Sequence, residues 1–387
     1  MGLLVALLWG GLACDEGGAD GPSSIFESTP VCAVPGHAPQ LRVYPRLDVI
    51  GPFGNALVSG ADSMWIVESG SNTVSRRSKS SGVLDEGFVD VGNDRNPYGI
   101  FVDEAVGELF VTNFAANTLT VASTRTGVVR QEISHPSFKN PSGVVATGTT
   151  IYVVNVNYLG QAEGYGPGSV SIVDRASLEV LGSIETAHKN PQYVTRLETL
   201  DGPRIAISNG GALRFGSEGL RIESEGSLEL WEETPSALEP KIVHFAIGQL
   251  AHPERGALGQ AMITADGRFI YAASGISPVL FKFDVANKRW IHASNDPLVL
   301  NAASGDATHA GALDARGLLY VTSFNQDALY VFDTACDKLL IGPIDLGITG
   351  DMLEGPQAIA LDEQGEQTDA YFIMSVSNAI GKVTVAF

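Results

Sequence analysis

The sequence predicts an all-β protein, a seven-bladed β-propeller of four-stranded antiparallel blades. Three observations predict this fold: strand triplets recur seven times, proline-led turns precede several of them, and 44 of the 387 residues are glycine. This glycine content is about 11%, where roughly 7% is usual, and it implies many tight turns. Seven units over residues 52–387 average 48 residues each (336/7), which is the period of a propeller blade.

Each unit follows the same order of strands. Asn-Pro precedes the first strand at 96–97, 140–141 and 190–191, and Gly-Pro takes this place at 355–356. The second strands are MWIVE (64–68), LFVTN (109–113), IYVVN (151–155), RIAIS (204–208), FIYAA (269–273), LYVTS (319–323) and YFIMS (371–375). A polar turn and a third strand follow. A β-helix is the structural alternative, but its repeats are far shorter.

The last unit is one strand short. It ends at its third strand, KVTVAF (382–387), while the strand-like segment 40–44 has no partner within its own unit. Blades must close into a ring to bury their apolar faces. We therefore expect residues 40–44 to supply the fourth strand of the last blade, so that the propeller covers 40–387.

Two repeats carry a resemblance to a known family. LFVTNFAANTLTV (109–121) and LYVTSFNQDALYVFD (319–333) resemble the repeats of the YVTN family of β-propellers. The resemblance covers nearly all of residues 45–387 and implies the propeller fold. It implies no single activity, because the family includes surface-layer, adhesive and periplasmic proteins.

The N-terminus resembles an export signal. The apolar run of residues 3–9 is too short to span a bilayer and is followed by Leu12-Ala13-Cys14, which resembles a bacterial lipobox. We expect a signal peptide at 1–13, lipidation of Cys14 and a flexible Gly/Pro/Ser-rich tether through residue 39. The protein would be exported and held at a periplasmic or outer-membrane face. The alternative is an ordinary secretory signal with an incidental cysteine.

The remaining cysteines form an even pair. The topology brings Cys32, on the approach to the closing strand, and Cys336, in a turn of blade six, to the same edge of the ring. We predict a disulfide between them, as suits an exported chain. The alternative is two free thiols.

The charge balance limits the possible partners. The chain has 24 basic and 44 acidic residues, a net charge of −20 with neutral histidine. A phosphate-binding face needs clustered Lys and Arg, so we expect no nucleic-acid partner. We also expect a monomer with no cofactor.

Long insertions predict where a ligand would bind. They occur in connections that leave the same face of a propeller, either between strands two and three or between strand four and the next blade. These segments are 155–168, 209–226, 248–260 and 295–309. Long loops on a rigid scaffold often carry binding residues, although neutral loop growth is the alternative.

The starts of the first strands point to the mouth of the central channel. Repeat alignment, with the register of blades one and five open by one residue, places a polar ring there: Asn55, Tyr98, Ser142, Gln192, Gln260, His309 and Gln357. This ring is rich in amides and almost uncharged. It suits a neutral glycan, a peptide or a protein ligand, and a water-filled channel mouth is the alternative.

Catalytic signals are sparse in the sequence. Asp306 and His309 form at most a two-ligand metal pair, and no hydrolase or phosphate-binding motif occurs. Glu68, Asn113 and Asn155 share one repeat position and are similar to the metal ligands of gluconolactonase-type propellers, but the repeat itself supplies such residues. The sequence therefore predicts a non-catalytic binding or scaffold propeller. A metal-dependent propeller hydrolase or lactonase is the alternative.

Overall fold

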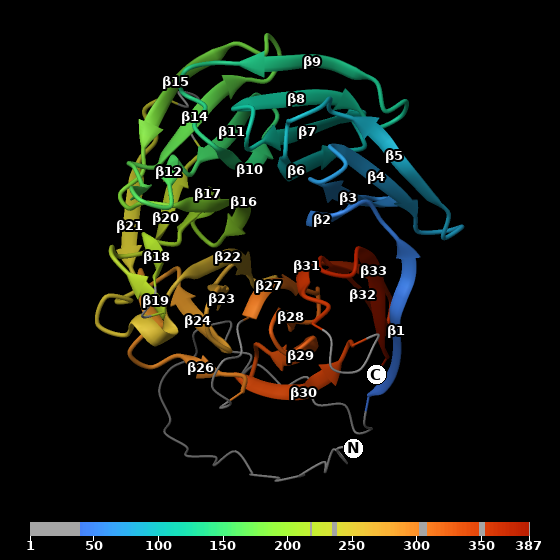
Figure 1. Ribbon diagram of the computed structural model, residues 1–387. Coiled ribbons are helices and arrows are strands. Elements are labelled where there is room, and N and C mark those ends of the chain that lie inside the picture. Colours follow the sequence, from blue (N-terminus) through green and yellow to red (C-terminus); the bar gives the residue numbers. More distant parts are fainter. Residues whose placement is uncertain (1–38, 217–218, 234–237, 302–307, 348–352, 387) are drawn as a thin grey trace, which may run out of the picture. The chain divides into compact units, whose positions relative to one another are not determined.

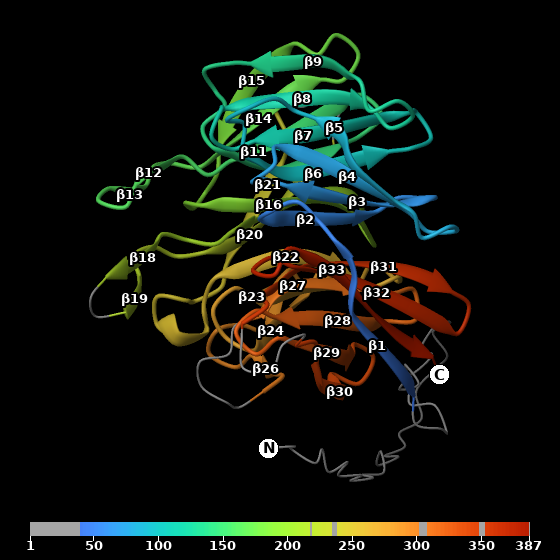
Figure 2. The same cartoon turned by 45° about the vertical axis from the view of Figure 1, so that its right-hand side comes forward.

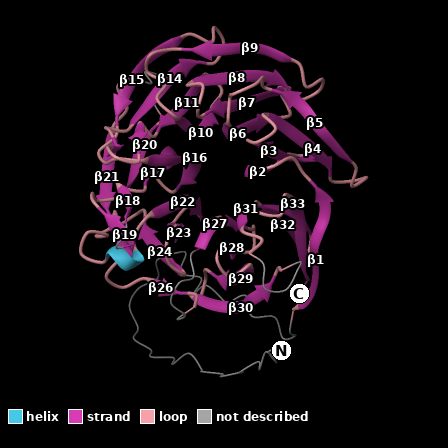
Figure 3. Cartoon of the chain, viewed as in Figure 1, coloured by secondary structure: helices cyan, strands magenta, loops and turns pink. Residues whose placement is uncertain are grey.

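Seven antiparallel sheets surround a central channel in a computed structural model of the chain (Figure 1). The structure describes residues 39–216, 219–233, 238–301, 308–347 and 353–386. Nearly all regular structure is strand, and one short 3₁₀ helix spans Pro253–Arg255 (Figure 3). The predicted seven-bladed propeller is confirmed.

Blades one to four use strands in chain order. Blade one has β2 (Gly54–Ser59), β3 (Ser63–Glu68), β4 (Thr73–Ser78) and β5 (Leu84–Asp90). Blade two has β6 (Pro97–Asp103), β7 (Glu108–Asn113), β8 (Thr118–Ser123) and β9 (Val129–Ser134). Blade three has β10 (Pro141–Ala146), β11 (Thr150–Asn155), β14 (Ser169–Asp174) and β15 (Val180–Glu185). Blade four has β16 (Pro191–Thr199), β17 (Gly202–Asn209), β20 (Ser227–Glu232) and β21 (Ile242–Ala246).

Blades five to seven complete the ring. Blade five has β22 (Leu258–Ile263), β23 (Phe269–Ser274), β24 (Val279–Asp284) and β25 (Arg289–His292), with the short β26 (Leu298–Val299) also paired to β24. Blade six has β27 (Thr308–Leu313), β28 (Leu318–Ser323), β29 (Ala328–Asp333) and β30 (Lys338–Asp345). Blade seven has β31 (Pro356–Gln364), β32 (Gln367–Met374), β33 (Ala379–Ala386) and β1 (Gln40–Val49).

The N-terminal strand closes the ring, as predicted. β1 runs antiparallel to β33, with Gln40 opposite Ala386 and Val43 opposite Val383. It is longer than the expected segment 40–44, because pairing resumes after an irregularity and continues to Val49. Blade seven therefore joins residues from both ends of the described chain.

The apolar core is divided among the blade junctions. Each junction holds its own cluster of buried apolar side chains, such as Trp65 with Leu109 between blades one and two, and Met64 with Tyr371 between blades seven and one. Strands inside a blade, such as β7 and β11, are buried on both faces because blades lie on either side of them, whereas the outer strand β15 alternates. This explains why the sequence shows continuous apolar runs at the second strands.

One backbone position recurs before the first strands. Asn96, Asn140 and Asn190 have φ values of 50°, 51° and 59°, and Gly355 has 69°. Asparagine and glycine tolerate this left-handed conformation. The Asn-Pro and Gly-Pro repeats thus mark a turn that needs positive φ. Blade one places Phe53 in the same conformation (φ 56°).

Two hairpins and a 3₁₀ turn extend one face of the ring. The hairpins are β12 (Tyr158–Gly160) with β13 (Gly164–Tyr165) and β18 (Leu213–Gly216) with β19 (Gly219–Ile222). Figure 2 shows both hairpins projecting from the same side of the propeller. We call this side, to which the four long insertions belong, the insertion face.

The predicted export features lie outside the described residues. This applies to the signal peptide, to Cys14 and to Cys32, whereas Cys336 lies in the turn between β29 and β30. The lipid anchor and the disulfide between Cys32 and Cys336 stay predictions. Within the described ranges, no helix is long and apolar enough to cross a membrane.

Candidate functional site: the central channel

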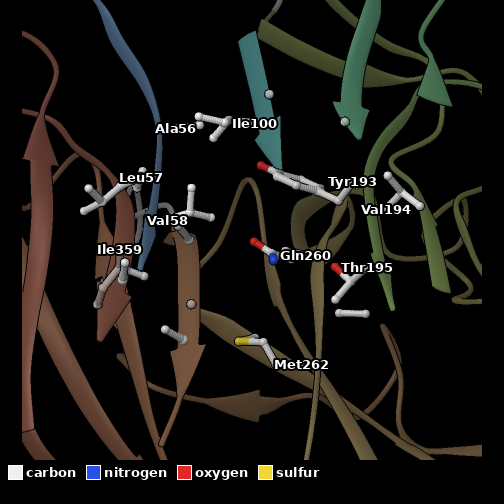
Figure 4. A pocket seen from close by; sticks show the side chains of 18 of the residues that line it. Ala56, Leu57, Val58, Ile100, Tyr193, Val194, Thr195, Gln260, Met262 and Ile359 are labelled. Atoms are coloured by element: carbon white, nitrogen blue, oxygen red, sulfur yellow. The ribbon is translucent and has the colours of Figure 1, made fainter. Parts of the chain in front are cut away.

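A cavity of about 490 Å³ occupies the central channel (Figure 4). Residues from the first strands of all seven blades line it. This volume lies within the range of sites for small molecules, roughly 300–1,000 Å³.

A β-bulge follows the first residue of every first strand. The pairing of each of these strands with its second strand shifts at this point, as between Pro97 and Ile100 or between Pro191 and Tyr193. Bulges re-aim side chains and often lie beside binding sites. Here the bulge lies at the insertion-face end of the channel.

Six of the seven predicted ring residues line the cavity: Asn55, Tyr98, Ser142, Gln192, Gln260 and Gln357. His309 directly follows Thr308 on β27, but its side chain lies outside the described part. The register of blade five needs a correction. Leu258 pairs with Ser274 as Pro97 pairs with Asn113, so Gly259 is the counterpart of Tyr98 and Gln260 comes one residue later.

Two ring residues tie neighbouring blades together. Asn55 Nδ2 donates to Pro97 O at 3.1 Å. Ser142 Oγ lies 3.1 Å from both Pro191 O and Gln192 O. These donors are therefore used within the protein, a role that the repeat alignment did not reveal.

Blades four and five place two large polar side chains at a position of small residues. The residue that follows the bulge is Gly99 in blade two, Gly143 in blade three and alanine in blades one, six and seven (Ala56, Ala310 and Ala358). In blades four and five it is Tyr193 and Gln260. Figure 4 shows both side chains projecting into the cavity. Tyr193 is not among the predicted ring residues, although a tyrosine at a position of small residues is a visible signal in the sequence.

Small residues prevail at this position because adjacent blades approach closely. A Cβ at Gly99 would lie 2.0 Å from Ser142 O, and one at Gly143 would lie 3.0 Å from Gln192 O. Close contacts of this kind occur between blades two and three and between blades three and four. Tyr193 and Gln260 enter the channel on blades four and five, where the insertions 209–226 and 248–260 also lie.

Tyrosines connect the channel with the insertion face. The Tyr98 ring packs on Phe114 with 5.5 Å between centroids, and Tyr158 packs on Tyr165 of the blade-three hairpin at 5.3 Å. Burial raises the pKa of Tyr193 and of Tyr98, with smaller contributions from Tyr98 and Tyr165, respectively. Both phenols thus stay neutral at physiological pH and can donate hydrogen bonds.

The channel is almost uncharged along its length. Glu363, near the far end of β31, is the one charged side chain among the lining residues of the described chain, and it accepts a hydrogen bond from Ala315 N at 2.9 Å. Between the polar mouth and this end, the wall is apolar, with Leu57, Val194 and Met262. The arrangement offers neutral hydrogen-bonding groups above an apolar tube.

The repeat-position carboxylate and amides serve their own blades. Glu68 accepts hydrogen bonds from Gly51 N, Ser75 Oγ and Thr73 Oγ1. The Nδ2 of Asn113 donates to two threonine hydroxyls and that of Asn155 donates to Ser171 Oγ, each within its own blade. These contacts support the structural interpretation of all three residues.

A metal centre of three or more side chains does not occur in the described part of the chain. No group of three His, Cys, Asp or Glu side chains there has a suitable arrangement. Asp306, the suggested partner of His309, lies outside the described residues.

Comparisons with solved structures agree on the fold. Hydrazine synthase of Kuenenia stuttgartiensis aligns with a TM-score of 0.64 and 16% identity over 87% of this chain and 96% of that chain. Virginiamycin B lyase of Staphylococcus aureus aligns at 0.65 and 13% over 90% and 99%. A catalytically inactive histidine variant of that lyase with quinupristin aligns at 0.66 and 14% over 89% and 99%.

These likenesses define the class of protein as a seven-bladed β-propeller and, at such low identity, show the fold alone. The sequence matches no family model and no curated protein. Membership of the YVTN family therefore stays a prediction from the repeat motifs.

Proposed function

We propose that this chain is a non-catalytic binding propeller that takes a neutral ligand at the insertion-face mouth of its channel. The supporting observation is the pair Tyr193 and Gln260, two large polar side chains on adjacent blades at a position of small residues. Packing does not require such residues there, because five other blades use glycine or alanine.

The hydrogen-bonding capacity of the mouth supports this proposal. The Tyr98 and Tyr193 hydroxyls and the Gln260 amide make no hydrogen bond to the described protein. Groups that a ligand can reach and that the fold does not use are the expected anchors of a binding pocket.

The chemistry of the lining favours an uncharged glycan or peptide. An amide and phenol lining pairs with hydroxyl and amide groups, and tyrosine rings offer flat apolar surfaces. An anionic ligand is disfavoured by the absence of lining Lys or Arg in the described chain and by the net charge of −20.

The site of action in this proposal is the cell envelope. An export signal and a lipidated Cys14 would hold the propeller at a membrane, with the tether of residues 15–39 between lipid and ring. The tether leads into β1, which starts from the face opposite the insertions.

A screen of neutral oligosaccharides and peptides tests the proposal. Gln260→Ala and Tyr193→Phe should weaken a ligand found in this way by roughly tenfold each, the worth of one hydrogen bond to a neutral group. Val83→Ser, an exposed change on the opposite face, is the matched control. A ligand unaffected by both channel variants would place binding elsewhere.

The second candidate is a metal-dependent propeller hydrolase or lyase. It is favoured by the shared fold with a lyase and by His309, which follows Thr308 on β27 at the repeat position of the predicted ring. Turnover of lactone or cyclic-peptide substrates that is lost in His309→Ala would favour catalysis over binding. Unchanged substrate after prolonged incubation with added divalent metals would support the binding role.

A further inference from the structure

Two histidines meet at the outer end of the junction between blades three and four. His188 lies in the connection from β15 to β16, and His244 lies on the outer strand β21. Their rings are 6.0 Å apart between centroids and nearly perpendicular, at 76°. His244 is exposed and His188 is half-buried, so solvent ions can reach the pair.

A buried network fixes the orientation of the His188 ring. Its Nδ1 lies 2.9 Å from Ser227 Oγ, which also accepts a hydrogen bond from Asn209 Nδ2 at 3.0 Å. The backbone of the same connection is held as well, because Ala187 N donates to Glu229 Oε1 at 2.8 Å. Ser227 and Glu229 are 0% and 1% exposed, so this support is part of the core.

The hydrogen bond at Nδ1 leaves the other ring nitrogen for an external ligand. A serine oxygen can accept from both Asn209 and an Nδ1–H, and this tautomer puts a lone pair on Nε2. Metal-binding histidines are commonly held in this way through the nitrogen that does not bind the metal. No hydrogen bond of His188 Nε2 to the described protein occurs, and the same holds for the His244 ring.

The surroundings of the pair favour a divalent cation. Glu225 and Glu229 are close enough to act on His188 electrostatically, and Ala187 N, next to His188, donates a hydrogen bond to Glu229 Oε1. The negative charge of these carboxylates offsets the charge of a bound cation.

We propose that His188 and His244 form a two-histidine site for a divalent transition-metal ion of the Zn²⁺ or Cu²⁺ type, independent of the channel. Imidazole is a preferred ligand of these ions. Zn–N bonds of about 2.0–2.1 Å need donor nitrogens roughly 3–4 Å apart, so the exposed His244 ring, whose centroid is 6.0 Å from that of His188, would have to turn its nitrogen toward the fixed His188 ring. Within the described residues no third His, Cys, Asp or Glu completes the set, so water fills the other positions.

A bound ion would join two blades. His188 belongs to the connection leaving blade three, and His244 belongs to the outer strand of blade four. The metal would hold this connection against β21 beside the long insertions of blades three and four. Binding should therefore stabilise the folded ring by mass action.

Calorimetric titration of the metal-free full chain with Zn²⁺ tests the proposal. The wild type should bind one ion, and His244→Gln should weaken binding by about tenfold or more. His292→Gln, which removes a histidine from the outer strand of blade five, should match the wild type. Zn²⁺ should also raise the melting temperature of the wild type and of His292→Gln, but not that of His244→Gln.

Two results would overturn the site. One is the absence of stoichiometric binding of Zn²⁺ and Cu²⁺ to the wild type. The other is equal affinity of the wild type and His244→Gln. Because His244 is exposed on an outer strand, its substitution leaves the fold intact, which the circular dichroism spectrum of the variant verifies.

Discussion

On the face opposite the insertions, the turn between β29 and β30 reaches across to blade five. Asp337 accepts hydrogen bonds there from Lys282 Nζ at 2.6 Å and from Tyr271 Oη at 2.7 Å. Between blades two and three, Arg175 likewise joins Asp103 at 2.8 Å. On the insertion face, blades are joined by contacts between side chains and backbone groups, such as those from Asn55 Nδ2 to Pro97 O and from Gly355 N to Asp327 Oδ1, and channel hydroxyls stay unbonded to the described protein.

The two faces of the propeller therefore have different roles, stability on one and binding on the other. Ion pairs on the opposite face join blade two to blade three and blade five to blade six. The insertion face is then free to vary in length and chemistry. Substitutions on the two faces should accordingly affect different properties.

The largest effect should come from the closing strand, which enters from the opposite face. Deletion of residues 40–48 removes the outer strand of blade seven and should lower the melting temperature by at least about 10 °C. A matched deletion on the insertion face, the hairpin tip 159–164, should change it by less than about 2 °C. Equal losses in both deletions would break the comparison.

The next effect concerns the buried charge at the junction of blades five and six. Asp337→Ala leaves the ammonium of Lys282, itself 6% exposed, without its carboxylate. Removing one member of a buried pair costs about 3 kcal/mol, measurable by urea denaturation. Asp296→Ala, an exposed carboxylate on the insertion face, should stay within about 0.5 kcal/mol of the wild type. A small loss in Asp337→Ala would mean that water solvates Lys282.

These same positions show which features of the fold the sequence predicts. Apolar second strands and Asn-Pro turns predicted the blades. A strand buried on both faces shows a continuous apolar run, and a turn with positive φ favours asparagine or glycine, so both features can be recognised within a few residues of sequence. The closing strand was predicted because the last unit has one strand fewer than the others. The junction contacts could not be predicted, because Lys282 and Asp337 lie 55 residues apart and neither belongs to a recurring motif.

The channel shows the same limit. Repeat alignment placed six polar residues on the channel wall, but it left the register of blade five open by one residue and overlooked Tyr193. Both shortcomings arise at the bulge, where one extra residue changes which side chain faces the channel. The donors of Asn55 and Ser142 have partners on neighbouring blades, and the spacing within one repeat carries no information about these contacts.

Alkaline pH should destabilise the protein through Tyr271, which donates a hydrogen bond to Asp337 on the opposite face. Burial, followed by the hydrogen bond to Asp337, raises the pKa of this phenol. In the unfolded chain tyrosine ionises near pH 10, so above this pH the unfolded state releases a proton that the folded state keeps. Stability is therefore lost as the pH rises above 10, by up to about 1.4 kcal/mol per pH unit. Tyr271→Phe should show a shallower loss in denaturation midpoints at pH 9–11, and equal slopes would contradict this origin.

The smallest effect should be a gain at Phe53 on the insertion face. Phe53 is 66% exposed and has φ 56°, where blades two to four use asparagine. Left-handed backbone costs a bulky residue roughly 1–2 kcal/mol, so Phe53→Asn should raise the free energy of unfolding by about 1 kcal/mol. Thermal denaturation measures the gain. A loss of stability would show that the packing of the ring outweighs the backbone strain.

The antiparallel pairing of Gln40 with Ala386 also sets the timing of folding. β1 is made before blades one to six and its partner β33 is made after them, so β1 stays unpaired with β33 while these six blades are synthesised. Local hairpins form early, whereas this contact of very high sequence separation forms late and slowly. The ring therefore closes only after β33 has been made.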